Sequence, residues 1–181
     1  KQRISLQQIQ DDLSNTLAAN PKTYSTSATL ALVSHISPQG FIQIQHVGDS
    51  RVYLFSGHQH KWYALTKDHN FLNEMAENGE IQIIVGQEYA SFYYMLNYCF
   101  CADSQHEIPE FSPQEEYLTE EDALLICSDG VHDILECDTW QPLLAETSLK
   151  TWLMEMKNAL YQHHAYDNVS MILIRLVQQG E

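Results

Sequence analysis

Four short acidic segments follow or precede predicted strands, and their side chains could hold divalent metal ions. In chain order they are residues 47–51 (VGDSR), 65–69 (LTKDH), 128–133 (SDGVHD) and 167–170 (DNVS). Carboxylates that end apolar strands converge on one rim of a sheet. Carboxylate oxygens are the ligands that hard divalent cations prefer. The four segments therefore predict a metal site at one end of a sheet.

The order of these segments resembles that of the metal-dependent protein phosphatases of the protein phosphatase 2C type, especially the bacterial members. The resemblance runs from about Thr26 to Leu176. It includes a small-hydroxyl segment that opens a strand, residues 27–29 (SAT), and a helix that ends in residues 79–81 (GEI). Asp-Gly and Asp-Asn pairs alone are ordinary turn residues. The resemblance therefore depends on all four segments occurring in the right order.

This resemblance implies a metal-binding role for four aspartates. Asp129 and Asp167 would be ligands of a catalytic pair of ions, and Asp49 and Asp133 would hold a further ion together with Asp129. The ions would be Mn²⁺ or Mg²⁺, two or three in number. Because Asp129 and Asp133 are four residues apart, a helical start after Gly130 would place both on one side.

Three further residues would support these ligands. Asn168 would orient Asp167, and Ser50 or Arg51 would do the same around Asp49. A structural ion pair of Arg51 is preferred to contact with a substrate phosphate, and no residue is assigned to substrate binding. The simpler alternative for each aspartate is a turn or cap residue that hydrogen-bonds its own backbone.

The implied chemistry is hydrolysis of phosphate monoesters. Two neighbouring cations lower the pKa of a bound water and neutralise charge on the phosphate. The resemblance thus implies a protein serine/threonine phosphatase that acts on phosphoserine and phosphothreonine with metal-activated water. The expected partners are a phosphoprotein substrate and a partner serine/threonine kinase. The alternative is a catalytically inactive phosphatase-like module that binds or regulates another protein.

One family segment does not occur in these 181 residues. The family has an Asp-Gly-x-Gly-Gly segment before the strand at Ser27, and its Asp and first Gly supply ligands to both catalytic ions. We expect an N-terminally incomplete phosphatase-like domain over residues 1–181. The retained acidic residues favour a fragment of a longer phosphatase, and the alternative is a protein that has lost catalysis.

Composition sets the class of protein and excludes some partners. With 181 residues and 44% apolar side chains, the chain can form one globular domain. Its net charge of −15 repels nucleic acids and anionic membrane surfaces. No apolar stretch approaches the roughly 20 residues that cross a bilayer, and no signal pattern begins the chain. These features predict a cytoplasmic protein that binds neither nucleic acid nor membrane.

Cysteine and histidine residues offer weaker candidates for chemistry. Cys99 and Cys101 could bind zinc with a distant histidine, but structural zinc sites usually place two or more residues between paired cysteines. Cys127 lies in an apolar strand and is expected to be a buried thiol. His69 is interpreted as structural, and the histidines at 163–164 as the end of a helix.

Hydrophobic periodicity predicts an α+β fold with mostly antiparallel strands. The resemblance sharpens this prediction to an antiparallel β-sandwich flanked by helices, in α-β-β-α order. Residues 86–102 are ambiguous, and residues 103–119 are expected to combine a loop with an edge strand. Helices are expected over residues 5–20, 71–78, 140–146 and 149–163, and strands over residues 28–36, 41–47, 51–55, 62–65, 122–127 and 168–177.

Overall fold

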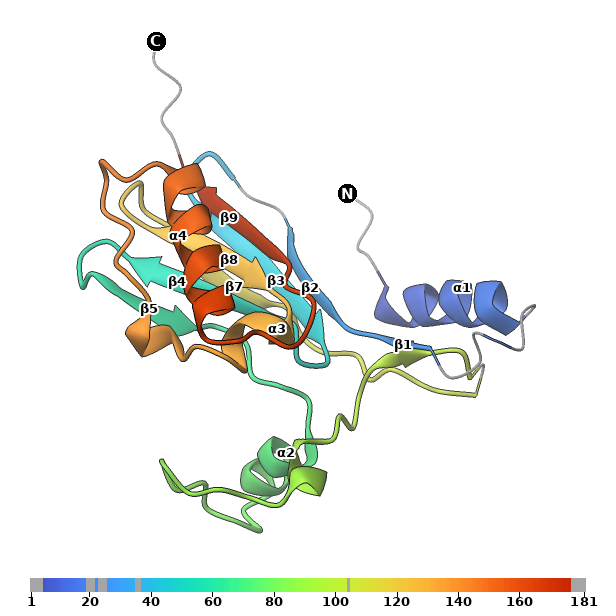
Figure 1. Ribbon diagram of the computed structural model, residues 1–181. Helices are drawn as coiled ribbons and strands as arrows, with labels where there is room; N and C mark the ends of the chain where they lie inside the picture. The colour runs from blue at the N-terminus through green and yellow to red at the C-terminus, as the bar shows by residue number, and fades with distance from the viewer. Residues whose placement is uncertain (1–4, 19–21, 23–25, 35–36, 104, 177–181) are drawn as a thin grey trace. The chain divides into compact units, whose positions relative to one another are not determined.

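The computed structural model describes residues 5–18, 22, 26–34, 37–103 and 105–176 (Figure 1). The chain divides into two compact units. The first unit contains Lys1–Leu30, Val47–Asp49 and Asp68–Ser112, and the second contains Ala31–His46, Ser50–Lys67 and Pro113–Glu181. The prediction of one domain over residues 1–181 stays a prediction.

Two sheets form the framework of the second unit. One sheet has the strand order β2-β3-β7, and the other has the order β5-β4-β8-β9. The pairs β3/β7, β4/β5, β4/β8 and β8/β9 are all antiparallel. The strands are β2 (Leu30–Ser34), β3 (Phe41–Val47), β4 (Arg51–Ser56), β5 (Lys61–Ala64), β7 (Gln114–Tyr117), β8 (Ala123–Cys127) and β9 (Met171–Arg175).

Side chains alternate between two hydrophobic cores along the central strands. On β8, Leu124 belongs to a core that also contains Ile42 and Ile44 of β3. Its neighbours Ala123 and Leu125 belong to a second core on the opposite face. This period of two is the signature of a strand buried on both faces. The predicted antiparallel β-sandwich is confirmed.

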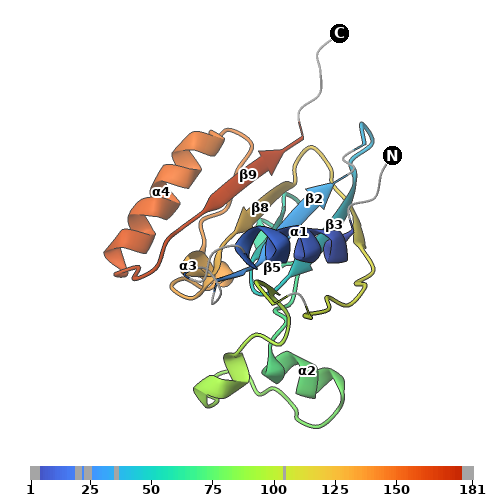
Figure 2. The ribbon, with the colours of Figure 1, turned by 90° about the vertical axis from the view of Figure 1, so that its right-hand side faces the viewer.

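Helix α4 (Leu149–Gln162) covers the outer face of the four-stranded sheet (Figure 2). Ser148 caps the helix by accepting a hydrogen bond from the Thr151 amide, at 3.0 Å. Trp152 of this helix packs against Trp62 of β5 and against Trp140, with ring centroids 5.0 and 6.5 Å apart. The indole N–H groups of Trp62 and Trp152 both donate to the carbonyl of Gln141.

The helix expected over residues 140–146 is wrong. A short 3-10 helix, Cys137–Thr139, precedes this segment, and residues 141–144 have no regular structure. Pro142 lacks an amide hydrogen and disfavours a helical residue before it. The carbonyls of this segment accept hydrogen bonds from the side chain of Arg175 instead of from the amides of a helix. Its guanidinium donates to the carbonyls of Leu143, Leu144, Ala145 and Thr147, at 3.0 to 3.5 Å.

The first unit is built around helix α1 (Leu6–Ala18), which lies within the predicted range of 5–20. Gln10 is buried and clamps the short strand β6 (Phe100–Cys101). Its side-chain amide donates to the carbonyls of Cys101 and Asp103 and accepts from the Cys101 amide, at 2.9 to 3.0 Å. Strand β6 pairs antiparallel with β1 (Ser27–Ala28).

Helix α2 (Phe71–Glu77) confirms the helix expected over residues 71–78. Asn70 caps its start by accepting a hydrogen bond from the Asn73 amide, and Gly79 follows its end with a φ of +74°. The ambiguous stretch after it contains a single 3-10 turn, η2 (Ser91–Tyr94), before β6. Within the described residues, no helix is both long and apolar enough to cross a membrane.

Replacement of Arg175 by methionine should destabilise the second unit. Four carbonyls would lose a charged donor, and a hydrogen bond to a charged group contributes about 1.5–3 kcal/mol. We expect the free energy of unfolding to fall by about 2–3 kcal/mol in urea denaturation. The exposed Lys150→Met variant is the matched control and should change it by less than about 0.5 kcal/mol. Equal effects of the two substitutions would contradict this role of Arg175.

Alkaline pH should destabilise the fold through Tyr53. Burial raises the pKa of Tyr53 from 10.0 to about 12, although the guanidinium of Arg51 beside its hydroxyl opposes this shift. The stabilisation by the neutral hydroxyl is complete below pH 10 and is lost as pH rises toward 12. Between pH 10 and pH 12 the free energy of unfolding of the parent should fall by about 2–3 kcal/mol more than that of the Tyr53→Phe variant. Urea denaturation at each pH measures this difference, and parallel pH profiles would contradict it.

Candidate metal-binding site

The segments that carry Asp129 and Asp167 meet at one end of the four-stranded sheet. Strands β8 and β9 pair up to Cys127 and Met171. Beyond that pair, the Ser128 amide donates to the Ser170 carbonyl, and the Ser170 amide donates to the Ser128 hydroxyl, both at 3.1 Å. The same hydroxyl lies 3.3 Å from the carbonyl of Asn168. Ser128 therefore ties the two acidic segments together.

Gly130 permits the close approach of these segments. A Cβ atom at this position would lie 2.5 Å from the carbonyl oxygen of Asn168. Real Cβ atoms do not approach backbone oxygens so closely, so any larger residue would force the segments apart. Glycine at position 130 is thus required by packing.

One oxygen of each carboxylate is held by the backbone. Asp129 Oδ1 accepts a hydrogen bond from the Gly130 amide, at 2.9 Å. Asp167 Oδ1 accepts one from the Asn168 amide, at 2.6 Å. These contacts match the simpler alternative of local turn residues. They also fix the direction of both carboxylates, and a second oxygen remains on each for a cation.

Asp133 lies one helical turn after Asp129. Helix α3 (Asp129–His132) starts at Asp129, and the Asp133 amide donates to the Asp129 carbonyl at 3.0 Å. Asp133 Oδ1 lies 3.2 Å from Nδ1 of buried His132. Contact with His132 lowers the pKa of Asp133, burial opposes this shift, and Arg51 adds to the lowering. Asp133 is therefore anionic at neutral pH.

Ser50 and Arg51 lie at the start of β4. Arg51 pairs in register with Cys127, two residues before Asp129. The guanidinium Nη1 of Arg51 donates to the Tyr53 hydroxyl at 3.1 Å. This contact supports a structural role for Arg51. The orienting roles assigned to Ser50, Arg51 and Asn168 remain predictions.

Asp49 belongs to the first compact unit, beside a rigid turn. Gly48 has a φ of +92°, and a Cβ there would lie 2.3 Å from the side chain of Thr29. The Gly48 amide donates to Nδ1 of His69, and the His69 amide donates to the Gly48 carbonyl. The His69 ring stacks on Phe111 with centroids 4.2 Å apart. These contacts give His69 a structural role, as predicted.

No preformed metal cage is assembled from the described side chains. Among them, no three His, Cys, Asp or Glu groups lie together in an arrangement that could hold a metal ion. The donor types at the β8–β9 end nevertheless fit a hard cation, since Asp129, Asp133 and Asp167 all supply carboxylate oxygens. The metal roles of these three residues and of Asp49 stay predictions, as does the weaker zinc site at Cys99 and Cys101.

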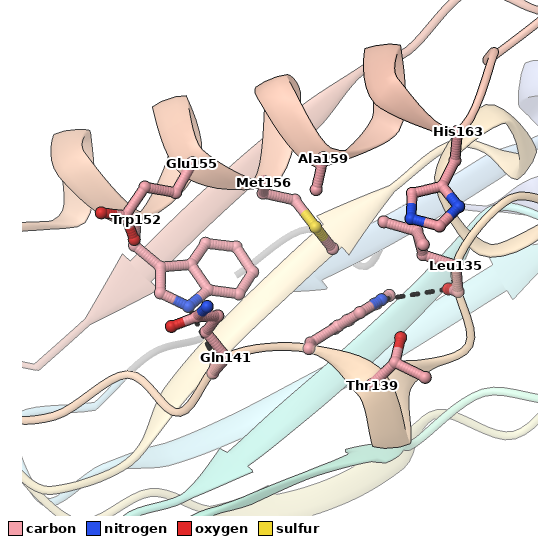
Figure 3. A pocket seen from close by; sticks show the side chains of 9 residues that line it. Leu135, Thr139, Gln141, Trp152, Glu155, Met156, Ala159 and His163 are labelled. Atoms are coloured by element: carbon pink, nitrogen blue, oxygen red, sulfur yellow. Dashed lines mark hydrogen bonds between the residues drawn. The ribbon is translucent and has the colours of Figure 1, made fainter.

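Two hollows lie beside helix α4. One, of about 260 Å³, lies between α4 and residues 135–141 and has Trp140, Trp152 and Met156 in its wall (Figure 3). It contains none of the predicted ligands. The other, of about 280 Å³, is lined by Asp167 and Asn168 together with Lys157 of α4. The second hollow therefore adjoins the candidate site.

Sequence reasoning did not identify the linking role of Ser128. Its position before Asp-Gly fits a helix N-cap, which is the only signal that the sequence offers for it. The contact of its hydroxyl with a segment 40 residues later depends on the pairing of β8 with β9.

Replacement of Gly130 by alanine should destabilise the site. In a helix this change alone would be favourable by about 1 kcal/mol. The clash with the Asn168 carbonyl should outweigh that gain, because overpacking costs about 1–3 kcal/mol. We expect a lower melting temperature in circular dichroism. An unchanged or raised melting temperature would show that the two segments can separate without cost.

Comparisons with known proteins give consistent results. The family model for protein phosphatase 2C matches residues 1–77. The “Putative protein phosphatase” of Mycoplasma pneumoniae is 26% identical over 164 residues, which are 90% of this chain and 61% of that protein. The serine/threonine phosphatase stp of Listeria monocytogenes is 26% identical over 152 residues, or 82% and 58%. The chain thus spans about three fifths of these relatives.

Solved structures share the fold. The serine/threonine phosphatase PstP/Ppp of Mycobacterium tuberculosis matches with a TM-score of 0.77 and 19% identity, over 93% of this chain and 68% of that one. The catalytic domain of the protein phosphatase PstP in complex with two manganese ions matches with a TM-score of 0.71 and 20% identity, over 93% and 67%. These matches confirm the predicted fold class.

Proposed function

We propose that the chain, which is similar to bacterial protein phosphatases and matches the protein phosphatase 2C model over residues 1–77, belongs to a metal-dependent protein serine/threonine phosphatase domain. Its substrates would be phosphoserine and phosphothreonine in a phosphoprotein. The ions would be Mn²⁺ or Mg²⁺, as manganese is bound by one solved structure of similar fold. A cytoplasmic location and a partner serine/threonine kinase are further parts of this proposal.

One observation supports the proposal most strongly. Asp129 and Asp167, which are 38 residues apart in the sequence, enter neighbouring segments that Ser128 and Gly130 hold at one sheet end. A turn residue that merely caps its own backbone has no need of this long-range arrangement. A pair of metal ligands does need it, because both must reach one cation at about 2.0–2.6 Å.

The residues of this chain would act on the ions and not directly on the phosphate. Asp129 and Asp167 would ligate the ions through the oxygens that the Gly130 and Asn168 amides leave available. Asp133 would add a negative charge that His132 and Arg51 stabilise. When bound, the ions would activate a water and neutralise the phosphate. The hollow beside Asp167 leaves space for part of a substrate.

The charge at this site makes a test of binding possible. If Asp129 and Asp167 are ligands of one cation, Mn²⁺ should stabilise the folded chain, because it then binds the native state preferentially. The expected gain is about 2.7 kcal/mol at a concentration 100 times the dissociation constant. Melting temperatures with MnCl₂, and with NaCl at equal ionic strength, measure it. The Asp129→Asn/Asp167→Asn variant should lose the response to manganese.

A control variant with the same change in charge separates a specific site from a general acidic surface. Asp12 and Asp138 are exposed and belong to other elements, so Asp12→Asn/Asp138→Asn should respond to manganese as the parent does. An equal manganese response in the parent and in the Asp129/Asp167 variant would exclude these carboxylates as the metal site.

Catalysis should depend on ligands that residues 1–181 do not contain. We expect these residues alone to hydrolyse a phosphopeptide poorly, because two-metal catalysis also needs the Asp-Gly-x-Gly-Gly ligands. A chain in which such a segment precedes them should show manganese-dependent turnover, and Asp129→Asn should reduce it by at least about 10²-fold. Manganese binding without turnover in that longer chain would favour the inactive binding or regulatory module.

A further inference from the structure

A group of apolar side chains is exposed on the first unit, between helix α2 and strand β6. Val85 is 100% exposed, and Ile84 is 57% exposed. We call the group the 83–95 surface, and its members are Ile83, Ile84, Val85, Phe92, Tyr94 and Met95. Exposed apolar groups in water are unfavourable, and contiguous ones mark interaction sites.

A defined turn presents Val85 to solvent. The Gln87 amide donates to the Ile84 carbonyl at 3.1 Å, and Gly86 has a φ of +80°. Gly at the third position of such a turn is typical of type II geometry, with Val85 at the second position. The Tyr89 hydroxyl accepts a hydrogen bond from the Ile84 amide at 3.0 Å. The turn is therefore ordered by contacts that leave its apolar side chains outside.

Ring contacts connect this turn with the remainder of the 83–95 surface. Tyr89 packs edge-on against Tyr93, with ring centroids 5.9 Å apart, and Tyr93 contacts Phe92 at 4.0 Å. The Met95 amide donates to the Phe92 carbonyl, and the Met95 carbonyl accepts from Phe71, the first residue of α2. The exposed side chains thus belong to one connected segment.

The surroundings of the 83–95 surface are acidic. Residues 68–112 contain eight acidic side chains and neither lysine nor arginine. Glu77, Glu80 and Glu88 are exposed close to the turn in sequence. A second copy of this chain would bring like charges together, and the net charge of −15 also opposes an anionic lipid surface. Charge complementarity selects a basic polypeptide.

We propose that the 83–95 surface docks a polypeptide segment of another protein that combines apolar side chains with lysine or arginine. The apolar side chains would cover Ile84, Val85 and Phe92, and the cations would pair with the surrounding glutamates. This docking depends on neither metal ions nor phosphate hydrolysis. It therefore stands separately from the proposed phosphatase activity.

The probe is a synthetic peptide of alternating leucine and lysine, with the same peptide carrying glutamate in place of lysine as its counterpart. Isothermal titration calorimetry at low salt should detect binding of the lysine peptide alone, and about 0.5 M NaCl should weaken it. The Ile84→Ser/Val85→Ser variant should weaken binding at least about tenfold. The Met154→Ser/Tyr161→Ser variant, which removes exposed apolar side chains from α4, should bind as the parent does.

Three further measurements distinguish other occupants of this surface. If sedimentation shows that the parent is a dimer and that the Ile84→Ser/Val85→Ser variant is a monomer, the occupant is a second copy of this chain and the proposal is overturned. If the parent cosediments with phosphatidylcholine–phosphatidylglycerol vesicles and the same variant does not, the occupant is a lipid surface and the proposal is overturned. A lower melting temperature of that variant would show that the side chains are covered within the chain, and equal binding of both peptides would remove the role of charge.

Discussion

Burial of strand β8 on both faces is the constraint on which the second unit depends. Its residues alternate between the core shared with β3 and the core beneath α4, and three of them, Ala123, Leu124 and Leu125, are fully buried. A slip of one residue in its pairing with β4 or β9 would exchange the two faces. The register of β8 also determines where Ser128 and Asp129 emerge, so the packing of the cores and the position of the candidate ligands have the same origin.

The side chains of β8 are apolar and packed in the two cores, whereas the residues that follow the strand include acidic ones. Three aspartates follow or adjoin strands there, and each has a local partner: a backbone amide for Asp129 and Asp167, and His132 for Asp133. Each of these partners belongs to a neighbouring residue in the sequence, so the contacts orient the three carboxylates locally. In the proposed function, a divalent cation would be held by oxygens of these carboxylates.

The sequence was sufficient to predict six of the strands and three of the four expected helices, because their periodicity and caps are local. Asn70 and Gly79, for example, delimit α2 by their own chemistry. The segment at 140–146 was predicted wrongly: Pro142 is a local signal against a helix there, and the carbonyls of the segment are satisfied by Arg175 and by two indoles from distant elements. For the candidate site, residue types and their order indicated the candidate ligands, whose metal roles stay predictions. The close contact of Gly130 with Asn168 and the link through Ser128 depend on tertiary pairing, which no local pattern encodes.

The clustering of the tryptophans has a consequence for how unfolding can be observed. The chain has three tryptophans, and Trp62, Trp140 and Trp152 all lie in one core of the second unit. Their ring centroids are 5.0 to 6.5 Å apart, so their emission reports a single environment. The first unit contributes only tyrosine and phenylalanine to the ultraviolet spectrum. Tryptophan fluorescence therefore does not report directly on loosening of α1 and α2, and an unfolding transition followed by emission alone describes the second unit.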